Sequence, residues 1–352
     1  MRRSLLVTAV VVMVLLGLAL PIISQEKTVR VVGSWGNLAL HKKFERPLWT
    51  EVLPQAFGGK LKPVLTTLEQ VKLSGAEVLR AMDKGVFDVV STVVDYVVSD
   101  APELAGLDLP AIAPDIGTAR KVVEAYKPVM AGVLEKTFNA KLLAVVPYPA
   151  QVLFSKIEIK GLADLKGKKV RASGWTTSQF VEALGATGVT ITFSEVATAL
   201  QRGVVDCAVT GSLSGYSAGW GEVSKYLYPL PIGGWDYVMT VMRLDVWNSF
   251  SPEERKTIES LMKEKYENPA WDDADDQTRQ GINCLTGKGD CQYGKPNSMQ
   301  LIEVTPTDIE LARKLLLEHV LPAWAKQAGE DAVKRWNESI GKVIGLKAEI
   351  KK

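Results

Sequence analysis

The sequence predicts an α/β protein made of two similar lobes with a cleft between them. Segments rich in β-branched residues alternate with segments of helical spacing from Thr28 to Val146. A second unit with the same alternation begins near Pro147. No low-complexity linker separates the two units, so we expect the chain to pass between them in strands, which would form a hinge.

The first unit is expected to hold a parallel sheet with helices on both faces, because strands and helices alternate along it. Ligands of such sheets bind outside the carboxyl ends of the strands. Gly33 bounds the first strand and Gly85 ends the second helix. The expected strands cover 28–32, 61–65, 87–92 and 141–146, and the expected helices cover 38–53, 74–84 and 118–137.

The second unit repeats this pattern, and the chain then returns to the first. Ser194 is the expected cap of its second helix, and Gly203 ends that helix. Ser251-Pro-Glu-Glu254 is a capping box that opens a long helix, and Thr307-Asp-Ile-Glu310 opens a later one. The expected strands are 169–172, 189–193, 204–210 and the crossing strand 237–244, and the expected helices are 177–184 and 195–202. We assign 26–147 with 237–277 to lobe I, and 148–236 with 278–352 to lobe II and the C-terminal helices.

The composition is that of an ordinary globular protein that can bury a sizeable core. The 352 residues suggest about two domains. Lys and Arg number 42 and Asp and Glu number 40, and this balance disfavours nucleic acid as a partner. Two histidines, His41 and His319, leave little material for His-based catalysis, so we expect no catalytic residues, no metal and no cofactor.

The N-terminus has the layout of an export signal. Arg2 and Arg3 precede an uncharged apolar run, residues 5–23, and polar residues follow. We expect residues 1–25 to be a signal peptide and the protein to be periplasmic. Ile22 and Ser24 make a poor cleavage site, however, and an uncleaved anchor is the alternative, since nineteen helical residues reach about 28 Å.

The three cysteines agree with an oxidising compartment. Cys284 and Cys291 close a short glycine-containing loop, and we expect a disulfide there. A zinc site or two unpaired thiols are the alternatives. Cys207 has apolar neighbours and is expected to be a buried, unreactive thiol.

Three motifs carry a resemblance to a known family. They are Leu162-Ala-Asp-Leu-Lys-Gly-Lys-Lys-Val-Arg171, Phe193-Ser-Glu-Val-Ala-Thr-Ala-Leu-Gln-Arg-Gly-Val-Val-Asp206 and Val246-Trp-Asn-Ser-Phe-Ser-Pro-Glu-Glu-Arg255. The sequence resembles the extracytoplasmic solute receptors of TRAP transporters over nearly the whole mature chain. That resemblance implies a periplasmic-binding-protein-like clamshell, a long helix spanning both lobes, and a small organic anion handed to an ion-driven permease.

The resemblance also implies site residues. Arg171 falls on the arginine that pairs with the ligand carboxylate, a role that suits its planar fork of donors. Phe193 matches an aromatic residue that lines the pocket, although core packing is the alternative. Gln151 stands where some members carry a second arginine, and Thr210 stands where the family usually shows Asn. One arginine fewer favours a monocarboxylate of modest size, or an aromatic or oxo acid.

Aromatic and polar residues near the predicted strand ends complete the candidate pocket. Tryptophan and tyrosine offer a flat apolar surface with a polar handle, which suits the carbon skeleton of an organic acid. Core packing is the more common role for any single one of them. The remaining candidates are Trp35, Asn37, Thr92, Tyr96 and Trp175, with Trp235 and Tyr148 less favoured.

The sequence therefore predicts a non-enzymatic receptor that delivers a small carboxylate to the membrane subunits of a TRAP permease. The receptor is expected to be a monomer. A ligand-sensing receptor for a kinase is one alternative, and a periplasmic hydrolase or lyase on a two-lobed scaffold is another.

Overall fold

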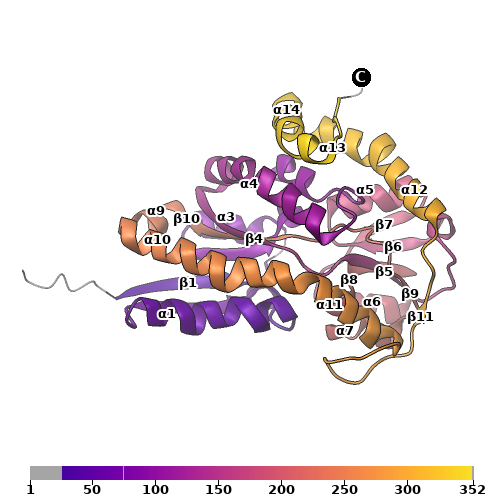
Figure 1. The fold of residues 1–352 in the computed structure, drawn as a ribbon, viewed down its shortest axis with the longest axis horizontal. Coiled ribbons are helices and arrows are strands. Elements are labelled where there is room, and N and C mark those ends of the chain that lie inside the picture. Colours follow the sequence, from indigo (N-terminus) through magenta and orange to yellow (C-terminus); the bar gives the residue numbers. More distant parts are fainter. Residues whose placement is uncertain (1–25, 74, 351–352) are drawn as a thin grey trace, which may run out of the picture.

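The computed structural model describes residues 26–73 and 75–350, and it consists of two sheets with helices packed around each (Figure 1). The predicted signal peptide, residues 1–25, lies outside the described residues. Within the described residues, no helix is both long and apolar enough to span a membrane. We call the part built on the five-stranded sheet lobe I and the part built on the six-stranded sheet lobe II.

The sheet of lobe I has the strand order β2-β1-β3-β10-β4. β1 pairs in parallel with both β2 and β3, because each connection between them carries helices and returns the chain to the same edge. Its strands are β1 (Lys27–Gly33), β2 (Leu61–Thr67), β3 (Val89–Val93), β4 (Ala140–Val146) and β10 (Val238–Arg243).

The sheet of lobe II has the strand order β11-β9-β5-β8-β6-β7. β6 pairs in parallel with β7 and β8, and β11 pairs in parallel with β9. Its strands are β5 (Gln151–Ser155), β6 (Lys169–Ala172), β7 (Thr187–Thr190), β8 (Cys207–Gly211), β9 (Tyr226–Tyr228) and β11 (Gln300–Leu301).

The expectation of purely parallel sheets is wrong for the two strands that cross between the lobes. β10 runs antiparallel to β3 and β4, and β5 runs antiparallel to β8 and β9. Each of these strands enters its sheet directly from the other lobe, without a helical crossover to reverse the chain, and so points the opposite way to its neighbours. The hinge of crossing strands is therefore confirmed, and both sheets are mixed.

Helices cover both sheets, and short 3₁₀ and π turns (η) extend several of them. The α-helices are α1 (Leu53–Ala56), α2 (Leu68–Val71), α3 (Glu77–Asp83), α4 (Ile116–Phe138), α5 (Trp175–Ala183), α6 (Val196–Arg202), α7 (Ser212–Ser217), α8 (Trp220–Val223), α9 (Leu244–Asn248), α10 (Pro252–Leu261), α11 (Asn268–Thr286), α12 (Pro306–Leu315), α13 (Leu321–Ala328), α14 (Glu330–Trp336) and α15 (Lys342–Ile344). The η turns are η1 (His41–Glu45), η2 (Leu48–Val52), η3 (Val94–Val97), η4 (Pro102–Leu107), η5 (Leu162–Leu165), η6 (Phe193–Glu195), η7 (Met262–Glu267), η8 (Leu316–Val320) and η9 (Asn337–Gly341).

Three local expectations differ from the structure. Ser194 lies inside η6, and the residue before α6 is Glu195, which makes no side-chain cap. Phe193 also belongs to η6 and not to the preceding strand, which ends at Thr190. The last long helical region begins at Pro306. The hydroxyl of Thr305 caps it, and Thr305 lies two residues before Thr307, the expected start.

One continuous helix crosses the molecule and links the lobes. The capping box at Ser251 opens it as expected, and α10, η7 and α11 then follow without a break. Its first part contacts α1 and its middle contacts β4, both in lobe I, while α11 packs against α7 in lobe II. Figure 1 shows this helix running along both sheets. The long helix implied by the resemblance is therefore present.

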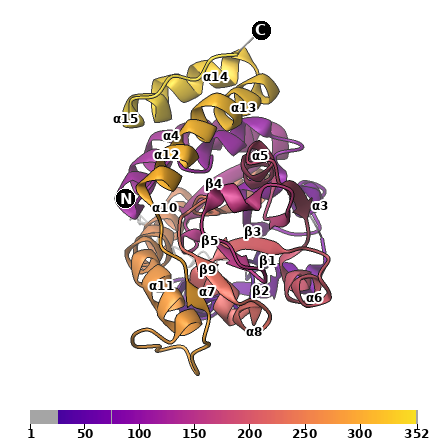
Figure 2. The ribbon, with the colours of Figure 1, turned by 90° about the vertical axis from the view of Figure 1, so that its right-hand side faces the viewer.

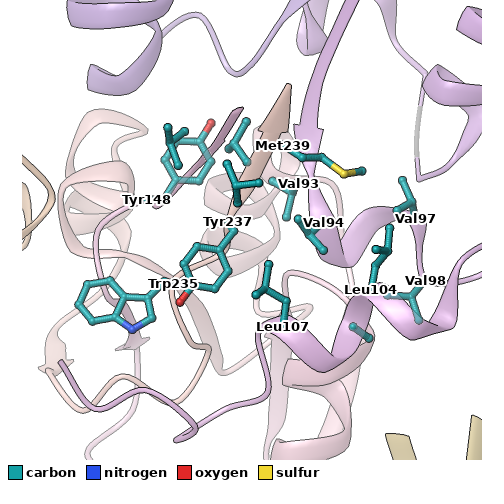
Figure 3. Packing of buried hydrophobic residues seen from close by; sticks show 14 of the residues in the cluster. Val93, Val94, Val97, Val98, Leu104, Leu107, Tyr148, Trp235, Tyr237 and Met239 are labelled. Carbon is teal, nitrogen blue, oxygen red and sulfur yellow. The ribbon is translucent and has the colours of Figure 1, made fainter. Parts of the chain in front are cut away.

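The two lobes share one continuous hydrophobic core. Where β3 ends and β10 begins, Val93 and Val94 pack beside Tyr237 and Met239 (Figure 3). Because β10 comes from the crossing segment, this packing ties the hinge to the core of lobe I. The backbone N–H of Val94 donates to the Tyr237 carbonyl at 2.9 Å, which fixes η3 against the same segment.

Most of the C-terminal helical segments pack against lobe I, while η8 contacts α5 of lobe II. α13 contacts η4, and η9 and α15 contact α4. Figure 2 shows them lying over α4. The lobe boundaries given from the sequence place 278–352 with lobe II and stay a prediction, and these contacts favour moving the last helices to lobe I.

The cysteines are arranged as expected. Cys284 and Cys291 form a disulfide, with an S–S distance of 1.99 Å. Cys207 is a free, buried thiol, and burial raises its pKa to about 11, which leaves it protonated and unreactive at neutral pH.

Candidate functional site

A cavity of about 550 Å³ lies between the lobes, at the carboxyl ends of β3 and β6. Both lobes line it. Lobe I contributes residues that follow β1 and β3, and lobe II contributes residues that follow β6 and β7. Six residues predicted from the sequence line this cavity: Trp35, Thr92, Tyr96, Arg171, Trp175 and Phe193.

Arg171 lies in β6 and is almost fully buried, with 1% of its surface exposed. Its Nε donates to the Ile191 carbonyl at 3.0 Å and its Nη1 donates to the Val209 carbonyl at 2.7 Å. Tyr96 of lobe I also acts on the guanidinium and tends to raise its pKa. Two backbone carbonyls of lobe II therefore hold the guanidinium in place and leave its remaining N–H donors available to the cavity.

Burial has the largest effect on Arg171 and lowers its pKa, while interactions with Tyr96 and Asp236 oppose this. An arginine stays protonated in proteins even so, because its ordinary pKa is so high. The Cζ atom also lies 5.6 Å from the centre of the Trp220 ring, a cation–π distance. The site thus holds a permanent, largely dry positive charge.

Aromatic rings form a row from one wall of the cavity into the core of lobe II. The Trp35 and Phe193 ring centres are 5.4 Å apart, across the two lobes. Phe193 lies 5.5 Å from Trp220, which in turn lies 5.4 Å from Phe154. Phe193 therefore both lines the cavity and packs in the core, so that its two expected roles coexist.

Buried carboxyl groups lie in and near the cavity. Asp95 lines the cavity from η3. Burial raises its pKa to about 7, and the charge of Asp236 adds to the shift. Burial likewise raises the pKa of Asp236 to about 6, against the attraction of Arg171 and a hydrogen bond from Ser173.

A third carboxyl, Asp108, fixes the crossing segment. It accepts hydrogen bonds from the backbone N–H groups of Trp235 at 3.0 Å and Asp236 at 2.6 Å. A Cβ on Gly234 would lie 2.1 Å from the Asp108 carboxylate, and the φ of this residue is +70°, so only glycine fits here. Burial raises the pKa of Asp108 well above its usual range.

The other sequence candidates do not line this cavity. Asn37 is exposed, and Trp235 is buried with its Nε1 donating to the Ala113 carbonyl. The Gln151 Nε2 donates to the Pro149 carbonyl, and Thr210 is buried in β8 opposite Val152. Tyr148 is also buried and away from the lining. Their assignment to the ligand site remains a prediction.

The sequence reasoning missed Asp95 and Asp236, two carboxyl groups that it could have found. Asp95 directly precedes Tyr96, just past a strand end, and Asp236 lies between Trp235 and Tyr237 in the crossing segment. It also missed the apolar lining by Leu68, Leu73 and Val78, because nothing in the sequence distinguishes these residues of α2, α3 and the segment between them from ordinary core residues.

The arrangement can bind an anion. A buried guanidinium with free N–H donors forms short, charge-assisted hydrogen bonds to a carboxylate, and the aromatic walls can cover an apolar body. Among the described residues, no group of three or more His, Cys, Asp or Glu side chains is placed to hold a metal ion.

Solved structures of similar shape come from bacterial solute receptors. DctP7 of Bordetella pertussis, an extracytoplasmic solute receptor binding pyroglutamic acid, has a TM-score of 0.79 and 21% identity, covering 91% of this chain and 99% of that one. A TRAP periplasmic solute binding protein from Desulfovibrio salexigens with bound orotic acid also has a TM-score of 0.79, with 17% identity, covering 90% and 99%. These likenesses establish the two-lobed fold.

Sequence comparison gives the family. The uncharacterized protein YiiZ of Salmonella typhimurium is 28% identical over 211 residues, which are 58% of this chain and 63% of YiiZ. The chain thus spans less than two thirds of the length of that relative. The family model of the bacterial extracellular solute-binding proteins, family 7 (DctP), matches residues 45–324, well over half of the chain. This protein belongs to that family of solute-binding proteins.

Proposed function

We propose that this protein is the periplasmic receptor of a TRAP transporter, that it binds a small organic monocarboxylate, and that it delivers the acid to an ion-driven permease. Family membership supports a solute-binding role. Structurally similar receptors were solved with pyroglutamate, orotate or succinate, all of them organic acids. We further propose that the receptor acts as an exported monomer and releases its ligand chemically unchanged.

One observation carries this proposal: the buried Arg171 guanidinium faces a cavity between the lobes. The carbonyls of Ile191 and Val209 orient it, so a ligand does not have to order this side chain on binding. A carboxylate that reaches the remaining N–H donors leaves water for a nearly dry site, where charge-assisted hydrogen bonds are stronger.

The charge of the lining favours one carboxylate over two. Among the described residues that line the cavity, Arg171 has the one cationic side chain, while Asp95 and Glu182 are acidic. A second carboxylate would therefore lack a partner and would meet acidic neighbours. The aromatic and aliphatic walls instead suit an apolar or aromatic body, as in an aryl or oxo acid.

In the proposed mechanism the acid binds Arg171 on lobe II first, and residues of lobe I such as Trp35 and Tyr96 then complete the enclosure. Contacts to both lobes favour the closed arrangement over the open one, so that binding shifts the population. The lobes would pivot on the crossing strands β5 and β10, with 26–147 and 237–277 as the proposed lobe I.

The test is a thermal-shift screen of mono- and dicarboxylates, followed by calorimetry on the acid that stabilises the protein most. Arg171→Ala should weaken its binding by at least about 100-fold, because the loss of a buried charge partner costs about 3 kcal/mol or more. Arg171→Lys should also bind weakly, since a lysine cannot make the same forked contacts.

Arg202→Ala is the matched control, because Arg202 is an exposed arginine on α6 of the same lobe. It should bind the acid like the wild type. Wild-type affinity in Arg171→Ala would overturn the assignment. Mass spectrometry should recover the acid unaltered, and uptake of the acid by cells should require both the receptor and the permease.

A further inference from the structure

The N-terminus of α5 lacks a cap from its own neighbours in the chain. Gly174 occupies the N-cap position, and it has no side chain to accept a hydrogen bond. A helix begins with backbone N–H groups that have no partner within the helix, and a side-chain acceptor or water must satisfy them. α5 follows β6, the strand that carries Arg171, so its position helps to set the position of the anion-binding wall.

The missing acceptor comes from the opposite lobe. Asp95 of η3 accepts a hydrogen bond from the Thr176 backbone N–H at 3.1 Å and another from the Thr176 Oγ1 at 3.0 Å. Both Asp95 and Thr176 are buried. An aspartate side chain at this position satisfies a first-turn N–H group, as an N-cap residue of the helix itself would do.

The fit between the two lobes is tight at this point. A Cβ on Gly174 would lie 2.2 Å from the Asp95 Oδ2 and 2.6 Å from its Cγ, so any larger residue would push the carboxyl away. The φ of Gly174 is −160°, which other residues adopt freely. Close approach of Asp95, and not backbone strain, therefore accounts for glycine at this position.

We propose that Asp95 is a positioning residue that caps α5 from across the cleft and stabilises the closed arrangement of the lobes. Opening the cleft must break this contact, because its two partners belong to different lobes. The contact places the first turn of α5 beside η3, and so it brings the wall that carries Tyr96 against the wall that carries Arg171. The inference rests on the proposed function only in assuming that the cleft opens to admit a ligand.

The test needs no ligand. Hydrogen exchange resolved to single amides would compare the Thr176 N–H in the wild type, Asp95→Ala and Asp95→Asn. Asp95→Ala should accelerate that exchange about tenfold, the usual effect of removing an N-cap acceptor. Asp95→Asn should stay close to the wild type, because asparagine caps helices about as well as aspartate. Amides of β8, inside lobe II, should be unaffected in both.

A second measurement reports the lobes directly. Spin labels at Gln55→Cys on α1 and Thr198→Cys on α6, two exposed positions on different lobes, would give the distance distribution between them. Asp95→Ala should shift this distribution toward longer distances, and Thr176→Val, which retains the N–H but loses the hydroxyl, should shift it less. Loss of a helix cap within one lobe would not move these distances.

Unchanged Thr176 exchange in Asp95→Ala, or an unchanged distance distribution, would overturn the proposal. The outcome is separable from that of the proposed function. Arg171→Ala should retain wild-type exchange at Thr176 whether or not the protein binds carboxylates, whereas Asp95→Ala should alter it in either case.

Discussion

Arg171 and Asp95 face the same cavity from opposite lobes, but they are held in different ways. The guanidinium of Arg171 is fixed by carbonyls of Ile191 and Val209, both in its own lobe. The carboxyl of Asp95 instead binds Thr176 of the other lobe. The first set of contacts can survive an opening of the cleft, and the second cannot.

This difference separates recognition from closure. A guanidinium anchored within lobe II is ready to receive an anion while the cleft is open, which lowers the entropic cost of binding. A contact between the lobes exists only in the closed arrangement. It therefore stabilises the closed arrangement relative to the open one, and this difference sets the populations of the two. The affinity of the receptor would then depend on both residues through separate steps.

The pH dependence of stability should single out Asp95. Its pKa is raised to about 7, so the folded protein holds this proton more tightly than the unfolded chain does. Its stabilising contribution is complete below about pH 4 and is lost as the pH rises through about 7, a change on the order of 4 kcal/mol. Urea unfolding at intervals from pH 4 to 8 should therefore show a steeper fall for the wild type than for Asp95→Asn.

Part of the slope should remain in Asp95→Asn. The pKa values of Asp236 and Asp108 are also raised by burial, so their contributions have the same sign. Asp83→Asn, at an exposed position on α3, is the control and should retain the full wild-type slope. Equal slopes in the wild type and Asp95→Asn would mean that Asp95 is solvated and that the lobes do not enclose it.

Gly174→Ala should disturb closure without touching Arg171. The added methyl group would collide with the Asp95 carboxyl, and overpacking of this kind costs about 1–3 kcal/mol. If that cost falls on the closed arrangement, the Kd for the acid found in the screen should rise about 5- to 150-fold, as measured by calorimetry.

Gly132→Ala provides a matched control for that substitution. Gly132 lies on an exposed face of α4, and a Cβ there would meet no atom within 4 Å. The change should leave the Kd unaltered and raise the melting temperature slightly, since alanine is the better helix former. Wild-type affinity in Gly174→Ala would show that the contact between Gly174 and Asp95 is not needed for binding.

Trp35 offers an uncharged contact between the lobes. Its ring centre lies 5.4 Å from that of Phe193, which belongs to lobe II. Trp35→Ala should weaken the binding of an aromatic acid about tenfold, because an aromatic contact and its buried area are lost. Trp35→Phe should recover part of that affinity in the same titration, and an alanine variant as tight as the wild type would remove Trp35 from the site.

Much of the fold could be predicted from the sequence because the signals are local. Alternating β-branched and helical segments located most of the elements, and the capping box at Ser251 marked the start of the long helix. The direction of β5 and β10 could not be read in this way. Strand direction depends on how the chain enters a sheet, and periodicity within a strand carries no such information.

The candidate site was predicted less completely. Arg171 and the aromatic residues were found because a motif and large side chains at strand ends point to them. The contact between Asp95 and Thr176 joins positions 81 residues apart, and only the folded arrangement brings them together. Gln151 and Thr210 were placed by counting along the chain from Arg171, and the structure instead buries them outside the cavity lining.

Removing the disulfide should have the smallest effect on ligand binding of all these changes, because the disulfide lies within a single stretch of chain next to lobe II. Cys284 is near the end of α11, which packs against α7, and its bridge to Cys291 closes a loop of 7 positions. Replacing both cysteines by serine should lower the unfolding free energy by about 2 kcal/mol through loop entropy. The Kd should stay unchanged, since the bridge makes no contact across the cleft. A higher Kd in that variant, measured well below its melting temperature, would mean that the end of α11 also takes part in closure. Contacts within a lobe could then not be separated from contacts between the lobes.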